Sequence, residues 1–438
     1  MQLAWWKRLL WNAVIILFLP VFLLAALLPG KRRDMLIWGP EPGIDNKYWS
    51  QAMKEVGHSS VTLMSDHYAI NKREDFDLYY DDFVPLPLPR RVRWVLGSCL
   101  AFIYALRRGK VVNTSFWGFS LGLSALWRLE SFFFRLSGTR VVIIGFGGDI
   151  YLYSKLADPS LRYGLLASYP HLALEESLTE RRIRYWTVRA DAILAGYMVD
   201  GIGRWDVTTH SVYIVDTRAW RPKPEYSMHD GLSGPVRILH APNHRGFKGT
   251  EFIVEAVETL KREGLQAELV LVEKIPNEQV KALMQEVDVL ADQCIMTGYA
   301  INSMEGMASG LPVLANLREE YYTRVFRRYG FLDECPILST SPENLLDNLR
   351  ILVRDPELRR TLGRAGRAFA EKYHSFAMAQ YLFGSIYARI VEGQEVDLMN
   401  LFHPLKSEYN RRTPRVVHPL VDSRLPATWS SDGLQKVR

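Results

Sequence analysis

Short apolar runs alternate with longer stretches of helical periodicity through most of the chain. The first apolar run, Met35–Trp38, is predicted to be a strand, and a helix from about Asn46 to Val56 follows it. This alternation is typical of a parallel sheet whose strands are joined by crossover helices. A second series of the same kind begins at Val236–His240, after the proline-punctuated segment Trp220–Pro224. The pattern therefore predicts an α/β protein with two doubly wound, Rossmann-like domains that face a cleft.

The other apolar runs and periodic segments extend both series. In the first series we expect the strands Val61–Met64, Leu78–Tyr80, Val111–Thr114, Val141–Ile144, Ile193–Ala195 and Val212–Val215, and the apolar helices Val95–Leu106 and Phe116–Leu136. In the second we expect the strands Glu268–Val272, Val289–Ala291 and Pro312–Ala315, the helices Glu251–Glu263, Asn277–Glu286 and Asn302–Ser309, and the helical blocks Pro342–Val353 and Pro356–Ile390. At 438 residues the chain exceeds one typical core, which also favours two domains. The predicted boundaries are 34–222 for the first domain and 223–395 for the second, followed by an irregular basic tail at 396–438.

The N-terminal segment, residues 1–33, has the pattern of a membrane anchor. Leu9–Leu28 is apolar except for Asn12, with Pro20 inside the run. Twenty helical residues span about 30 Å, which matches the hydrocarbon core of a bilayer. Basic residues flank the run, including Lys31–Arg33. We expect a single N-terminal membrane anchor, and the pattern leaves open whether the helix spans the bilayer or lies in its interface.

Composition and charge narrow the functional classes. The net charge is +6, and clusters of basic residues lie in the first half of the chain, at 90–93, 107–110 and 181–184. Such clusters suit an anionic membrane surface or simply a solvated helix face. No recognised nucleic-acid module accompanies them, so we expect no nucleic-acid partner. The three cysteines, Cys99, Cys294 and Cys335, have neither metal-ligand spacing nor the pattern of a disulfide framework, and no metal site is predicted.

Two segments combine a predicted strand, a loop and a helix start with residues suited to a phosphorylated ligand. The first, Leu239–Thr250, holds Arg245 and Lys248 just before a helix. The second, Thr297–Pro312, places backbone amides at 298–300 ahead of a helix that carries Glu305. Cations and a helix N-terminus favour phosphate, and a carboxylate inside the helix can accept hydrogen bonds from ribose hydroxyls. Loops of this kind collect ligands at the carboxyl edge of open α/β sheets.

The two segments and their surroundings resemble the family 4 glycosyltransferases, which are retaining enzymes of the GT-B fold. The resemblance covers most of Met35–Ile390. It is carried by the Lys248-Gly249 pair with Glu305, and by further matches at Gly39–Gly43, Gly57-His58, Gly147-Gly148-Asp149, Val212–Pro222 and Pro356–Tyr373.

The resemblance implies the roles of individual residues. It implies catalytic roles for Asp149, Lys248 and Glu305. It implies substrate contacts from Gly43, His244, Arg245, Lys248, Thr297, Gly298, Tyr299, Ala300 and Glu305. In the family two glutamates stand with seven residues between them, and this chain has Thr297 at the place of the first.

The expected function is transfer of a sugar from a nucleoside diphosphate donor to a lipid-linked or glycan acceptor in polysaccharide biosynthesis. The resemblance implies retention of the anomeric configuration, with no metal or other cofactor. Membrane lipid is an expected partner, and the catalytic domains are expected to face the cytoplasm, where activated nucleotides occur. Thr297 keeps an alternative open, because a chain without the usual glutamate could be a catalytically silent scaffold in a membrane polysaccharide assembly.

Overall fold

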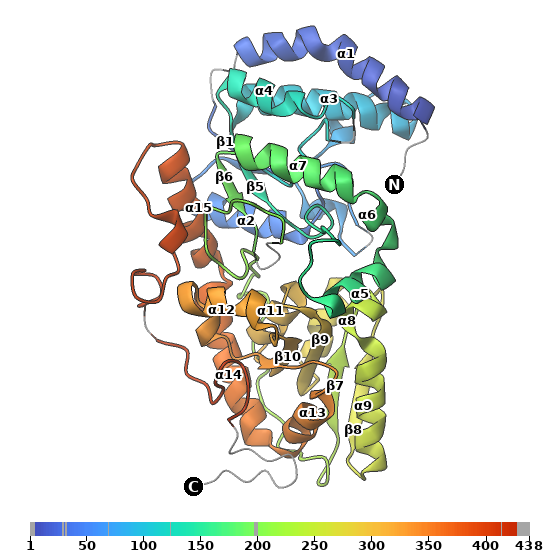
Figure 1. Cartoon of the computed structure of the whole chain (residues 1–438), viewed down its shortest axis with the longest axis vertical. Coiled ribbons are helices and arrows are strands. Elements are labelled where there is room, and N and C mark those ends of the chain that lie inside the picture. The colour runs from blue at the N-terminus through green and yellow to red at the C-terminus, as the bar shows by residue number, and fades with distance from the viewer. Residues whose placement is uncertain are drawn as a thin grey trace.

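The structure is a computed structural model that describes residues 5–28, 30, 33–68, 70–122, 124–196, 200–412 and 414–426. It contains two α/β lobes, the N-lobe around strands β1–β6 and the C-lobe around strands β7–β11, which lie one above the other in Figure 1. The predicted pair of doubly wound parallel-sheet domains is therefore confirmed. Lys31, Arg32 and the tail after residue 426 lie outside the described residues.

The N-lobe is built on a six-stranded parallel sheet in the order β3-β2-β1-β4-β5-β6. Its strands are almost wholly buried and apolar, as expected for a sheet covered by helices on both faces. The strands are β1 (Met35–Trp38), β2 (Ser60–Met64), β3 (Leu78–Tyr79), β4 (Gly109–Thr114), β5 (Arg140–Ile144) and β6 (Ala192–Leu194). The helices are α2 (Ile44–Glu55), α3 (Arg90–Arg108), α4 (Leu129–Ser137), α5 (Pro159–Ser168), α6 (Pro170–Leu174) and α7 (Glu176–Arg189), with 3-10 turns at Arg73–Asp75 and Tyr80–Phe83.

The C-lobe has a five-stranded parallel sheet in the order β11-β10-β9-β7-β8. The strands are β7 (Val236–His240), β8 (Ala267–Leu271), β9 (Val289–Thr297), β10 (Val313–Asn316) and β11 (Leu338–Ser339). The helices are α8 (Arg245–Lys248), α9 (Thr250–Arg262), α10 (Asn277–Met284), α11 (Ile301–Ala308), α12 (Glu320–Tyr329), α13 (Leu345–Arg354), α14 (Pro356–Tyr373) and α15 (Phe376–Ile390), with 3-10 turns at Leu332–Glu334 and Leu398–Asn400.

The last helix joins the two lobes. In Figure 1, α15 lies beside α2 of the N-lobe, and the two helices pack together. Phe383 of α15 contacts Trp38 of β1 edge to face, with ring centroids 4.8 Å apart. The following segment, as far as residue 426, has little regular structure and packs back on the C-lobe, where the Tyr409 hydroxyl donates to the Lys372 carbonyl over 2.6 Å. Besides the linker that precedes β7, the chain therefore crosses between the lobes twice more, which limits how far they can separate.

The N-terminal helix α1 (Trp5–Leu27) packs along α3 and α4 at the outer end of the N-lobe (Figure 1). Trp11 contacts Trp94 at 5.1 Å between ring centroids, and Phe22 contacts Phe102 at the same distance. Asn12, the polar interruption in the apolar run, accepts a hydrogen bond from the Ala125 amide over 3.0 Å. In the part of the chain that the structure describes, no helix is long and apolar enough to cross a membrane, so the membrane-spanning anchor is not supported.

Two predicted elements of the N-lobe are different in the structure. Phe116–Leu136 was expected to be one helix, but among the described residues of that segment only those of α4 are helical. The reason is Glu130, which is fully buried and accepts hydrogen bonds from the amides of Phe119, Ser120 and Leu121, so those residues turn around its carboxylate. Val212–Val215 forms no strand, because its backbone pairs with Trp49 and with the His374 carbonyl instead of a sheet neighbour.

Candidate functional site

A cavity of about 560 Å³ lies between the two lobes. Its N-lobe wall is formed by residues that follow β1, β2, β4 and β5, and its C-lobe wall by residues that follow β7, β8 and β9. Both parallel sheets therefore present their carboxyl ends to one space, which is where open α/β sheets bind ligands. The volume falls within the roughly 300–1,000 Å³ typical of small-molecule sites.

Lys248 lies on the C-lobe wall and is held by a buried polar network. It is the last residue of α8, and its Nζ donates to Asp292 Oδ1 over 2.7 Å and to Gln293 Oε1 over 2.8 Å. Asp292 also accepts hydrogen bonds from Asn302 and Ser303 at the start of α11. Burial acts to raise the pKa of Asp292, but the ammonium and these hydrogen bonds lower it overall. The network fixes a positive charge beside the N-terminus of α11.

Glu305 lines the same wall one turn further into α11. Glu305 is 4% exposed, and its carboxylate accepts a hydrogen bond from Asn277 Nδ2 over 3.1 Å. Burial, together with the nearby charges of Asp292 and Asp45, raises the pKa of Glu305 to about 8. Lys248 and Glu305 therefore share one cavity, as the sequence predicts.

Arg245 and His244 do not line the cavity. The Arg245 guanidinium is exposed and pairs with Glu251 over 2.8 Å and with Glu273 over 3.2 Å. The His244 ring lies against Tyr169, with 4.4 Å between the ring centroids. The predicted contacts of these two residues with substrate stay predictions, and in this conformation Arg245 is directed to surface carboxylates instead.

The segment from Thr297 to Ala300 is committed largely to internal contacts. Thr297, which ends β9, donates its hydroxyl to Asp158 Oδ2 over 3.1 Å, and the Gly298 amide donates to the Asn316 carbonyl over 2.7 Å. Tyr299 is fully buried, and its hydroxyl donates to His374 Nε2 over 2.9 Å. Of these four residues only Ala300 lines the cavity, at the entrance to α11.

Asp149 is fully buried behind the N-lobe wall and is not among the residues that line the cavity. Its Oδ1 accepts hydrogen bonds from the Phe146 and Gly147 amides, each over 3.0 Å, and its Oδ2 accepts one from the Phe116 amide over 3.1 Å. These contacts brace the loops after β4 and β5. Gly43, in contrast, lies in the lining at the start of α2.

Three charged residues that line the cavity are not among the site residues predicted from the sequence. Glu41 and Asp45 follow β1 on the N-lobe wall, and burial raises the pKa of each to about 7. Lys274 follows β8 on the C-lobe wall and has a backbone φ of 56°, which is unusual for a residue other than glycine. Its ammonium has no hydrogen-bond or ion-pair partner among the described residues. Glu41 could have been predicted from its place in the Gly39–Gly43 loop, which the sequence analysis singles out. For Lys274 the sequence offers only its position after a predicted strand.

Metal ligands are not gathered in the described part of the chain, where no three His, Cys, Asp or Glu side chains come close enough to hold an ion. The three cysteines are buried and free.

No protein-family model matches the chain, and no curated protein matches it in sequence. Among solved structures, it is similar to a sucrose-phosphate synthase from Thermosynechococcus elongatus, with 12% identity over 83% of this chain and 100% of that chain and a TM-score of 0.49. It is also similar to WaaG, a glycosyltransferase involved in lipopolysaccharide biosynthesis (12% identity, 79% and 97% covered, TM-score 0.39), and to the wall teichoic acid polymerase TagF (11% identity, 90% and 100% covered, TM-score 0.38). Scores and identities this low say nothing about activity, so the function has to be inferred from this chain's own residues.

Proposed function

We propose that this protein is a GT-B glycosyltransferase that moves a sugar from a nucleoside diphosphate donor to a glycan acceptor. The observation that carries the proposal is the cavity between two doubly wound lobes, with Lys248, Lys274, Glu305 and the start of α11 on one wall. Cations beside a helix N-terminus suit a diphosphate, and a carboxyl group inside the helix suits a ribose.

The two lysines have complementary roles in this proposal. Lys248 is fixed by Asp292 and Gln293, so it offers a preorganised charge that needs no rearrangement when the donor binds. Lys274 has no partner in the described structure and can turn its ammonium to the phosphates. As the bond to the sugar breaks, negative charge grows on the departing diphosphate, and both ammonium groups stabilise it. The proposed reaction therefore calls for no metal or organic cofactor.

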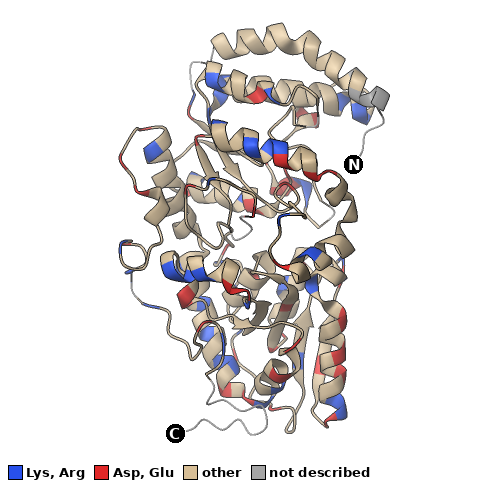
Figure 2. Cartoon of the chain, viewed as in Figure 1, with Lys and Arg blue, Asp and Glu red and all other residues tan. Residues whose placement is uncertain are grey.

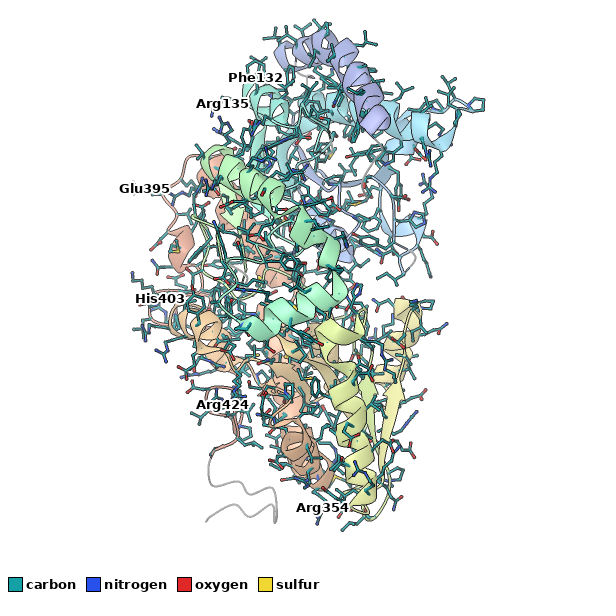
Figure 3. All side chains as sticks on the ribbon, turned by 45° about the vertical axis from the view of Figure 1, so that its right-hand side comes forward. Phe132, Arg135, Arg354, Glu395, His403 and Arg424 are labelled. Carbon is teal, nitrogen blue, oxygen red and sulfur yellow. The ribbon has the colours of Figure 1, made fainter. Side chains whose placement is uncertain are left out.

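The outer face of α1 supports a place for the protein at a membrane. One side of α1 packs on the N-lobe, whereas Leu9, Ile16, Leu17 and Leu24 on the other side, and Leu28 directly after the helix, are 54–76% exposed. Figure 2 shows this helix free of charge beyond its first turns, and in Figure 3 Phe132 and Arg135 of α4 point outward beside it. We call these exposed leucines and the isoleucine, together with Phe132, the α1 face.

We infer that the α1 face lies on an anionic bilayer. Exposed arginines stand near both ends of α3, at 90, 91, 107 and 108, and so flank α1 along its length. Basic groups at the rim of an apolar helix face are attracted to anionic lipid headgroups while the apolar side chains enter the interface. The helix then lies along the membrane surface, and the catalytic lobes face the cytoplasm, where nucleotide sugars are made.

Vesicle binding tests the α1 face. Replacing Leu17 and Leu24 with Asp should weaken binding to vesicles of phosphatidylglycerol and phosphatidylcholine at least tenfold, because each lost leucine removes about 1–2 kcal/mol of buried apolar surface. Leu174→Asp is the matched control, since Leu174 is 84% exposed on α6, away from this face. Equal sedimentation of both variants with the vesicles would rule out the α1 face as the docking surface.

Donor binding tests the enzymatic proposal. The full chain is screened by thermal shift against UDP-, GDP-, ADP-, dTDP- and CDP-linked sugars. A ligand that binds only the folded state raises the melting temperature by mass action, so the donor identifies its own base and sugar. Release of nucleoside diphosphate from the selected donor separates an enzyme from a silent scaffold. If no nucleotide sugar shifts the melting temperature, the proposal is wrong.

A further inference from the structure

Helix α5 belongs to the N-lobe but packs on the part of the C-lobe that holds Lys248. In Figure 1 it lies beside α8, whose last residue is Lys248, and it also packs against β9, which carries both partners of that lysine. Two glycines allow this close approach. A Cβ atom at Gly164 would lie 3.0 Å from Ile295 Cγ2, and one at Gly246 would lie 3.2 Å from Ala167 Cβ. The backbone that carries Lys248 therefore rests on the other lobe.

Both ends of α5 are hydrogen-bonded to the C-lobe. Asp158 is the N-cap of α5, and its Oδ1 accepts from the Ser160 amide over 2.8 Å. Its Oδ2 accepts from the hydroxyl of Thr297 over 3.1 Å, across the boundary between the lobes. At the other end of the helix, Ser168 Oγ accepts from the amide of Phe247 in α8 over 3.2 Å. The helix is therefore tied to both β9 and α8.

The turn before α5 is fixed by a third contact with the C-lobe. The amides of Ala157 and Asp158 donate to the hydroxyl of Tyr322 in α12, over 3.1 and 3.3 Å. That hydroxyl donates in turn to Asp200 of the N-lobe. Asp158 and Tyr322 are both buried. Asp158 therefore reaches the C-lobe from a fixed position, and Thr297 holds its remaining carboxylate oxygen.

The type of residue at position 297 decides whether this contact can form. A threonine hydroxyl donates a hydrogen bond to a carboxylate, whereas an ionised glutamate is an acceptor only. A glutamate at position 297 would also set a like charge beside Asp158. The resemblance to family 4 places a glutamate here, and threonine is a replacement that allows the contact between the lobes.

We propose that Thr297 is a positioning residue that docks α5 on α8 and β9 and thereby holds Lys248 in place for the donor diphosphate. The inference rests on the proposed function for the identity of the ligand. Thr297 acts through Asp158, α5 and the backbone of α8, without touching the substrate. When its hydrogen bond is lost, α8 loses the support of α5, and a displacement of about 1 Å is enough to weaken a preorganised contact severely.

Thr297→Val tests this role, because it keeps the shape of the side chain and removes the donor. By calorimetry, affinity for the nucleoside diphosphate of the donor selected by thermal shift should fall roughly tenfold. Affinity for the parent nucleoside should change less than twofold, because Lys248 contacts only the phosphates. A general loss of structure would weaken both ligands alike.

Two variants serve as controls. Thr297→Ser keeps the hydroxyl and should bind the diphosphate as the wild-type protein does. Thr340→Val removes the hydroxyl of another buried C-lobe threonine, one that donates to the Leu338 carbonyl over 2.9 Å, and should leave both affinities unchanged.

A disulfide can replace the lost hydrogen bond. Ala167→Cys and Gly246→Cys, added to Thr297→Val, place two Cβ atoms 3.2 Å apart before adjustment, near the roughly 3.5–4.5 Å of a disulfide. Oxidation should bring the diphosphate affinity back to within threefold of wild type, and reduction should lower it again. The three native cysteines are buried, and peptide mass mapping identifies the bond between positions 167 and 246.

The outcomes separate this inference from the proposed function. A diphosphate affinity of Thr297→Val within twofold of wild type, an equal loss for nucleoside and diphosphate, or no recovery on oxidation would overturn the positioning role and leave the proposed function standing. If the wild-type protein binds no nucleotide, the proposed function fails, and hydrogen exchange then judges the docking of α5 by itself. The Phe247 amide should exchange roughly tenfold faster in Thr297→Val than in wild type, and an equal rate would show that Thr297 does not dock α5.

Discussion

The two walls of the interlobe cavity are organised in opposite ways. On the C-lobe wall Lys248 is held by Asp292, which also accepts hydrogen bonds from Asn302 and Ser303, and Lys274 is the one charged residue of this wall without a partner among the described residues. On the N-lobe wall the carboxyl groups of Glu41 and Asp45 are left without ionic partners among the described residues, and Asp45 Oδ1 is buried with no hydrogen bond. The C-lobe wall, where hydrogen bonds fix Lys248 in place, suits a ligand whose charge is always the same, such as a diphosphate. The N-lobe wall, with its unpaired carboxyl groups, suits neutral hydroxyls.

The largest expected effect concerns the C-lobe wall. Lys248→Ala leaves Asp292 buried without its counter-ion, which should lower the free energy of unfolding by about 3–5 kcal/mol. Chemical denaturation measures the loss. Lys248→Met combined with Asp292→Asn should recover much of it, because no isolated charge remains. If Lys248→Ala is as stable as wild type, the Lys248–Asp292 pair does not stabilise the C-lobe wall.

A substitution of Lys274, on the same wall, is expected to change ligand affinity and stability in opposite directions. Lys274→Gly should weaken nucleoside diphosphate binding by about 10- to 150-fold, the loss of one charge-assisted contact of about 1.5–3 kcal/mol. It should also raise the free energy of unfolding by about 1 kcal/mol, because glycine adopts a positive φ without strain. Calorimetry and denaturation measure the two effects.

Arg245→Ala is the matched cation control for Lys274. Its guanidinium lies outside the cavity lining and pairs with exposed carboxylates, so we expect less than a twofold change in affinity. A tenfold loss would instead place Arg245 on the diphosphate in the bound state, as the sequence suggests.

The smallest effect concerns pH and three carboxyl groups of the cavity lining, those of Glu41, Asp45 and Glu305. The pKa values of Glu41, Asp45 and Glu305 lie near 7, 7 and 8 in the folded protein, well above the usual range near 4 of an unfolded chain. The folded state therefore holds more protons than the unfolded state between about pH 4 and 8, and stability falls as the pH rises through this window. The melting temperature should drop from pH 5.5 to 8.5, and Asp45→Asn should flatten that slope. A melting temperature that rises with pH would contradict the raised pKa values of these three carboxyl groups.

Local patterns in the sequence predicted the frame of the molecule and part of the site. Strand positions followed from buried apolar runs, and Lys248 and Glu305 met in one cavity because each follows a strand at the carboxyl edge of the same sheet. The orientation of Arg245 could not be predicted, because it depends on Glu273, which comes from the end of another strand. The strand expected at Val289–Ala291 is longer in the structure, where β9 continues as far as Thr297.

The N-lobe was harder to predict because long-range contacts decide its irregular parts. Glu130 reorganises the segment from residue 116, and the amides around Asp149 come from two different loops. The apolar run of α1 fits both a membrane anchor and a surface helix, and only its packing on α3 and α4 reveals which side chains remain exposed. Propensity and periodicity carry no information about such contacts.

The central claim is that the C-lobe wall binds a diphosphate, and calorimetry tests it most directly. Uridine, guanosine, adenosine, thymidine and cytidine are each titrated into the full chain beside the corresponding diphosphate. We predict that at least one diphosphate binds tenfold or more tightly than its own nucleoside, because the ammonium groups of Lys248 and Lys274 contact the phosphates. Equal affinity of every nucleoside and its diphosphate, or no binding by any of them, would contradict it.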